Sequence, residues 1–158
     1  MEQKYIRVML ESLNKKEKVL LQLIKKSEEQ KDILSEANMN WDRFDINLEE
    51  KDILVQEILR QDEGFQGLYD RIKEPLVNKK ELYREEISLL QEGIRKVTEL
   101  GARLEAMEQR NKKLVEARLA EGRQTIKQSQ IGSRAAAEYY QRMNKINTVD
   151  PQLMDKKS

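Results

Sequence analysis

The fold follows most directly from residues 83–104, which read YREEISLLQEGIRKVTELGARL. Apolar or small residues recur in this stretch with alternating spacings of four and three over three heptads. They are Tyr83, Ile87, Leu90, Ile94, Val97, Gly101 and Leu104. A heptad repeat places these residues along one stripe of an α-helix and marks a helix that packs against other helices. The stretch therefore predicts an all-α bundle.

The composition favours elongated helices over a thick, round core. The chain has 158 residues, of which 38% are hydrophobic and 37% are charged, with two Phe and one Trp. Its length fits one domain. So few large apolar side chains suit helices that each bury a single stripe.

Neither cysteine nor histidine occurs in the chain. Their absence excludes disulfides, thiolate zinc sites and the side chain that most often performs acid–base catalysis near neutral pH. We therefore expect a protein that is not an enzyme and has no cofactor and no metal site. Because no apolar run is long enough to cross a bilayer and no signal peptide is visible, we also expect a cytoplasmic protein without membrane insertion.

The pattern predicts three long helices, over residues 5–37, 48–74 and 79–131. Asn47 begins a capping-box pattern before the second helix, and Pro75 is expected to end it. The first helix carries a heptad stripe that polar residues interrupt. The interruptions are Lys16, Ser27 and Gln30.

The predicted helices differ in length, and this difference predicts a protrusion. At ~1.5 Å per residue the first helix spans about 50 Å and the third about 80 Å. Short connections join antiparallel neighbours, so the third helix outgrows its companions near residue 115. We therefore expect an elongated up-down-up antiparallel three-helix bundle over residues 1–115. Residues 116–158 are expected to form a protruding C-terminal helical arm that binds a partner, followed by a flexible tail.

The expected arm is basic and carries a thin apolar stripe. Residues 110–146 hold nine basic and three acidic side chains, a net charge of +6. Spacings typical of helix-in-groove recognition and a Tyr–Tyr pair predict a surface for a partner helix. The candidate partner-binding residues are Leu119, Ile126, Ile131, Ala135, Tyr139, Tyr140 and Met143.

Two other interpretations of this basic segment stay open. The segment could instead pack back on its own bundle, which would leave no arm. Its charge also suits phosphate neutralisation, but no nucleic-acid-binding motif is present and three glutamates interrupt the basic run, so we do not expect nucleic-acid binding.

Four stretches of the chain are similar to a known protein family: DEGF at 62–65, LEAMEQRNKKL at 104–114, SRAAAEYY at 133–140 and MDKK at 154–157. Together they resemble the FlgN family of flagellar type III export chaperones, in the form found in Gram-positive bacteria. The similarity extends over nearly the whole chain in length and helix order.

The resemblance implies a small cytoplasmic chaperone of bacterial flagellum assembly. Such a protein binds the terminal helices of hook-associated proteins, which join hook to filament, prevents their premature assembly and aids their delivery to the type III export apparatus. It also implies that the C-terminal region binds these partners. For an export chaperone of this kind we expect the free protein to be a monomer. The alternative is a structural coiled-coil protein whose arms pair with each other.

Overall fold

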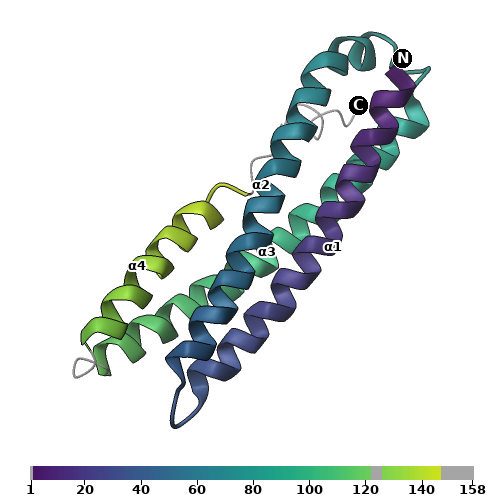
Figure 1. The fold of residues 1–158 in the computed structure, drawn as a ribbon. Helices are drawn as coiled ribbons and strands as arrows, with labels where there is room; N and C mark the ends of the chain where they lie inside the picture. The colour runs from purple at the N-terminus through teal and green to yellow at the C-terminus, as the bar shows by residue number, and fades with distance from the viewer. Residues whose placement is uncertain (1, 122–125, 147–158) are drawn as a thin grey trace.

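The structure, a computed structural model, describes residues 2–121 and 126–146, and for residues 126–133 it describes the backbone alone. Within these residues the chain forms four helices and no strand. They are α1 (Glu2–Ser35), α2 (Trp41–Asn78), α3 (Arg84–Glu121) and α4 (Ile126–Met143). The three long helices alternate in direction and form an elongated bundle (Figure 1). The predicted all-α, up-down-up fold is confirmed.

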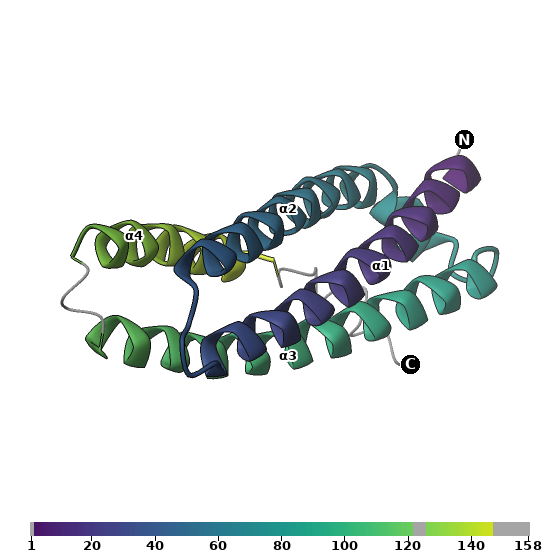
Figure 2. The same ribbon diagram turned by 60° about the horizontal axis from the view of Figure 1, so that its bottom comes forward.

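Helix α1 is the central element of the bundle. It lies between α2 and α3 and packs against both (Figure 2). Hydrogen bonds join Ser27 to Glu108 and Gln30 to Asn111, and each pair is 81 positions apart in the chain. The parallel helices α1 and α3 therefore keep the same register along this part of their contact.

The buried positions of α1 follow the predicted heptad seam with alternating spacings of three and four. They include Ile6, Met9, Leu13, Lys16, Leu20, Leu23, Ser27, Gln30 and Leu34. The polar interruptions of the pattern thus face the interior together with the apolar residues. A heptad seam sets the direction of each side chain, whatever its polarity.

Helix α2 is longer than predicted at both ends. Its N-cap is Asn40, whose side-chain oxygen accepts hydrogen bonds from two backbone N–H groups of the first turn. Asn47, the predicted cap, is buried inside the helix and donates from Nδ2 to the carbonyl oxygen of Lys26 at 3.0 Å. Pro75 also lies inside the helix, so the expectation that it ends the helix was wrong.

The C-terminal part differs from the predicted protruding arm. Helix α3 ends at Glu121 rather than at residue 131, and α4 continues through Gly132 and Ser133. Helix α4 folds back, and its C-terminal part packs against α2 (Figures 1 and 2). The buried residues near its C-terminal end are Ala136, Tyr139, Met143 and Ile146. Folding back removes from water the apolar stripe that a free-standing helix would expose.

Candidate functional site: a polar layer beneath the fourth helix

The residues predicted to bind a partner lie against the protein's own bundle. Tyr139 is 1% exposed and Met143 is 6% exposed. Leu119, Ala135 and Tyr140 are half-buried and pack against the same core. The side chains of the other two candidates, Ile126 and Ile131, lie outside the described residues. In this conformation the stripe of α4 is therefore covered by its own body.

Tyr139 is the main contact of α4 with the bundle. Its ring lies over the Lys51 amine of α2, with 4.9 Å between Nζ and the ring centroid. Its hydroxyl donates a hydrogen bond to the sulfur of Met143 at 3.7 Å. The ring of Tyr140 meets it edge-on at 5.3 Å, and the Lys112 amine of α3 lies 5.6 Å from the Tyr140 centroid. The tyrosine pair thus contacts cations from two helices.

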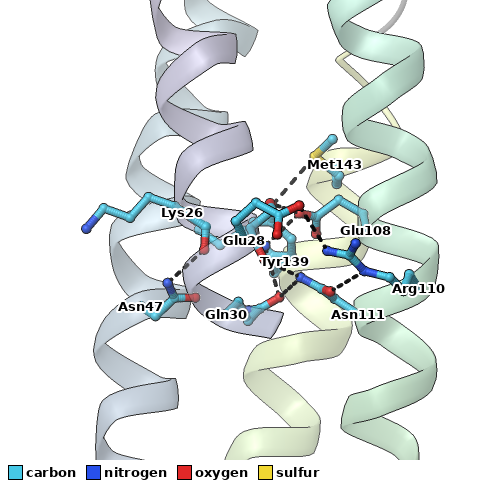
Figure 3. Close-up of polar contacts among 11 residues, drawn as sticks. Lys26, Glu28, Gln30, Asn47, Glu108, Arg110, Asn111, Tyr139 and Met143 are labelled. Atoms are coloured by element: carbon cyan, nitrogen blue, oxygen red, sulfur yellow. Dashed lines mark hydrogen bonds and ion pairs between the residues drawn. The ribbon is translucent and has the colours of Figure 1, made fainter. Parts of the chain in front are cut away.

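A polar layer lies in the interior beneath Tyr139 (Figure 3). Lys51, which is 0% exposed, donates to the carboxylate of Glu108 at 2.6 Å and to the side-chain oxygen of Gln30 at 3.0 Å. Ser27 donates to the same Glu108 oxygen at 2.5 Å. Asn111 donates to the Ser27 carbonyl oxygen at 2.9 Å and to Gln30 at 3.0 Å. We call these five residues of α1, α2 and α3 the polar layer.

Burial sets the electrostatics of this layer. Loss of solvation lowers the pKa of the Lys51 amine, and the neighbouring Glu108 carboxylate raises it in part. Burial, followed by the charge of Glu108, raises the pKa of Tyr139 well above its ordinary value. The same causes, in the same order, raise the pKa of Tyr140. Both phenols are therefore held in the neutral form.

The polar layer restricts the ways in which the helices can pair. An ion pair in the interior contributes little net stability, because desolvation of the two charges offsets their attraction. A shift of α2 or α3 by one heptad would, however, leave Lys51 and Glu108 buried without each other. Polar residues at core positions of coiled coils fix register and partner number in this way.

One ion pair and one hydrogen bond hold the C-terminal end of α4 and the turn that follows it. Arg142 donates two hydrogen bonds of 2.7 Å to the carboxylate of Asp52 on α2. Near the end of α4, Lys16 of α1 donates to Asp62 of α2 at 2.7 Å and to the carbonyl oxygen of Ile146 at 3.3 Å. Helix α4 is thus attached to α2 directly and to α1 through one lysine.

The sequence pattern indicated the polar residues that α1 contributes to this network, but not their partners in α2 and α3. Lys16, Ser27 and Gln30 stand out as polar residues in an apolar stripe. Their partners stand on the same kind of stripe in α2 and α3. In α2 the stripe has spacings of three and four: Phe44, Leu48, Lys51, Val55, Ile58, Asp62, Phe65, Tyr69, Ile72 and Leu76. Reading Lys51 and Asp62 as stripe members would have indicated complementary charges in the core.

The arrangement is suited to binding between helices. Among residues 2–121 and 126–146, no group of three or more Asp or Glu side chains is placed to hold a metal ion. Within the same ranges, no helix combines the length and the apolar character needed to cross a membrane. Comparison with known protein families, curated proteins and solved structures gives no match.

Proposed function

We propose that the protein is a flagellar export chaperone of the FlgN type that is not an enzyme. In this proposal it acts in the cytoplasm, binds the terminal helices of hook-associated proteins and prevents their premature assembly. It then aids their delivery to the type III export apparatus. The four resembling stretches support this assignment, and an all-helical bundle with a short fourth helix is compatible with it.

The four resembling stretches carry the proposal, and the position of Tyr139 decides how a partner helix would have to bind. The residue belongs to the stripe predicted to bind a partner helix, yet it is buried against Lys51 of its own bundle. In the proposed mechanism, α2 covers the stripe of α4 in the free protein, and α4 leaves α2 when a partner helix is bound. A covered stripe would keep the free chaperone from pairing with itself.

The way in which α4 is attached makes this exchange physically reasonable. Helix α1 packs along both α2 and α3, whereas α4 packs mainly along α2. Beneath Tyr139 the bundle presents the polar layer, so release of α4 uncovers buried polar groups together with apolar ones. Charged groups gain solvation when they are uncovered, which offsets part of the lost apolar burial.

The same attachment limits the affinity for a partner. A partner must supply the free energy that separates the docked state of α4 from the released state. Coupled folding of two segments costs a further ~2–5 kcal/mol of the interaction energy. The complex is then specific but reversible, as release before export requires.

A binding assay with a purified hook-associated protein tests the proposal. The full chain is expected to form a one-to-one complex by size-exclusion chromatography with light scattering. Replacing Tyr139 and Met143 together by alanine should abolish the complex, while the control Ile53→Ala, on an exposed part of α2, should retain it.

Two outcomes of this assay would contradict the proposal. One is the failure of every hook-associated protein encoded in the same genome to bind. The other is a stable dimer of the chain alone that the Tyr139 and Met143 variant dissociates, which would favour the structural coiled-coil alternative.

A further inference from the structure

The face of α2 that carries α4 continues beyond the end of α4. Asp52 lies in the part of this face that α4 covers, and its carboxylate accepts the two hydrogen bonds of Arg142. From Asp52 onward, side chains with spacings of seven, four, three and four fall along one side of the helix. They are Leu59, Glu63, Gln66 and Asp70. The end of the described C-terminal segment lies level with the start of this series, because Lys16 contacts both Asp62 and the carbonyl oxygen of Ile146.

An open groove of about 550 Å³ lies on this continuation. Its lining comes from α2 and from the residue before Ile146: Leu59, Asp62, Glu63, Gln66, Gly67, Asp70 and Lys145. At Gly67 a Cβ atom would meet nothing within 4 Å, so the backbone of α2 is open to close approach at this point. A helix of another chain could therefore come nearer to α2 here than a larger side chain would allow.

The charge of the groove is predominantly negative. Three carboxylates, from Asp62, Glu63 and Asp70, line it together with one amine, from Lys145. Asp62 is held by Lys16 on its inner side, whereas Glu63 and Asp70 are exposed. Asp70 already pairs with Lys73 at 3.8 Å and accepts a hydrogen bond from Gln66 at 2.9 Å. Glu63 is therefore the carboxylate best placed to meet a cationic side chain of another chain.

We propose that this groove is a second docking surface, which takes a positively charged amphipathic helix of a partner protein, placed end to end with α4. Two observations support this occupant: the groove continues an existing helix–helix interface, and its carboxylates complement a basic partner. The inference does not depend on the release of α4, and it therefore stands apart from the proposed chaperone function.

The protein's own C-terminal residues are a poorer fit to this groove. Residues 147–158 contain two aspartates, two lysines and Pro151, and their net charge is zero. A neutral segment has no electrostatic preference for an acidic surface, and a proline inside it opposes a helix. Charge complementarity therefore favours a basic helix from another protein.

A synthetic peptide tests the groove in the full-length protein. The probe is a fluorescent helical peptide with an apolar stripe at i, i+4 and i+7 flanked by arginines, and its binding is followed by fluorescence anisotropy. We expect saturable binding that shifts the amide resonance of Gly67. A matched peptide with glutamates in place of the arginines should not bind.

Substitutions within α2 localise the binding. Gly67→Leu places a side chain in the groove and should weaken binding at least about tenfold. Gly64→Leu is the matched control: a Cβ there also meets nothing within 4 Å, but this residue does not line the groove, so affinity should stay unchanged. Replacing Glu63 by Gln together with Asp70 by Asn should weaken binding about fivefold. The exposed pair Glu85→Gln and Glu99→Gln on α3 should leave the affinity unchanged.

Four results of the peptide assay would overturn the proposal. They are the absence of saturable binding, equal binding of the glutamate peptide, equal effects of Gly67→Leu and Gly64→Leu, and tighter binding after Lys156 and Lys157 are replaced by glutamine. The last result would mean that the chain's own C-terminal lysines occupy the groove. A dimer of the chain that Asp70→Asn dissociates would likewise contradict a partner helix, because the occupant would then be a second copy.

Discussion

Lys51 of α2 and Glu108 of α3 form an ion pair of 2.6 Å in the interior of the bundle, where the two side chains are 0% and 3% exposed. Tyr139 of α4 covers the pair on the side of the fourth helix. This relationship links the stability of the three-helix body to the docking of α4, because the same buried amine contacts both.

Removal of one charge of this pair should be strongly destabilising. Glu108→Ala leaves Lys51 buried without a counter-charge, so we expect a loss of about 3–5 kcal/mol in the free energy of unfolding. The double variant Lys51→Met, Glu108→Leu should recover most of this loss, because two apolar side chains need no partner. Urea unfolding followed by circular dichroism measures both. A single variant within about 1 kcal/mol of the wild type would mean that the pair is solvated.

The ion pair between Arg142 and Asp52 should control how often α4 leaves the bundle. Asp52→Asn removes the charge that accepts two hydrogen bonds, and we expect a loss of about 1–3 kcal/mol in α4 docking. Hydrogen exchange should then become faster in residues 134–143, while the amides of α1 keep their protection. Glu49→Gln, an exposed change on the same helix, serves as the control. Unchanged exchange in α4 would show that the ion pair does not hold it.

The two neighbouring tyrosines should respond differently to truncation. Tyr139 is buried over Lys51, whereas Tyr140 is half-buried. We expect Tyr139→Ala to undock α4 and to speed exchange throughout its C-terminal half, because a large buried ring is lost. Tyr140→Ala should have a clearly smaller effect in the same experiment. Equal effects would contradict the burial of Tyr139.

Stability should fall at alkaline pH because of the buried phenols. Burial raises the pKa of Tyr139 and Tyr140 in the folded protein above their ordinary value of about 10. The stability that these two phenols contribute is therefore fully present below about pH 10, and it is lost as the pH rises toward their pKa in the folded protein. The wild type should lose more stability between pH 9 and about pH 11 than the double variant Tyr139→Phe, Tyr140→Phe. Parallel losses in the two proteins would assign the effect to other groups.

The sequence predicted the long helices because their stripes are nearly complete. In residues 83–104 almost every seam position is apolar or small, so periodicity alone identifies the helix. The start of α2 was less clear, because Asn40 and Asn47 can both accept hydrogen bonds from a helix N-terminus. Asn47 is drawn into the interior by its hydrogen bond to Lys26, which is a tertiary contact that local sequence does not contain.

The position of α4 could not be obtained by adding helix lengths. A third helix that continued to residue 131 would outgrow its companions, whereas α3 ends at Glu121. The available signal is Gly122, which follows directly and is the residue type most common just beyond a helix end. The docking of α4 on α2 then depends on the pairing of Arg142 with Asp52, which are 90 positions apart. Such a pairing becomes visible only when both helices are placed.

The affinity of the full chain for a hook-associated terminal helix, measured by calorimetry with and without Asp52→Asn, tests the central claim most directly. The substitution leaves every residue of α4 intact and weakens only its attachment to α2. If α4 is the partner-binding element and is covered in the free protein, Asp52→Asn should raise the affinity at least about fivefold. An unchanged or lower affinity, with α4 exchange accelerated as expected, would contradict the claim.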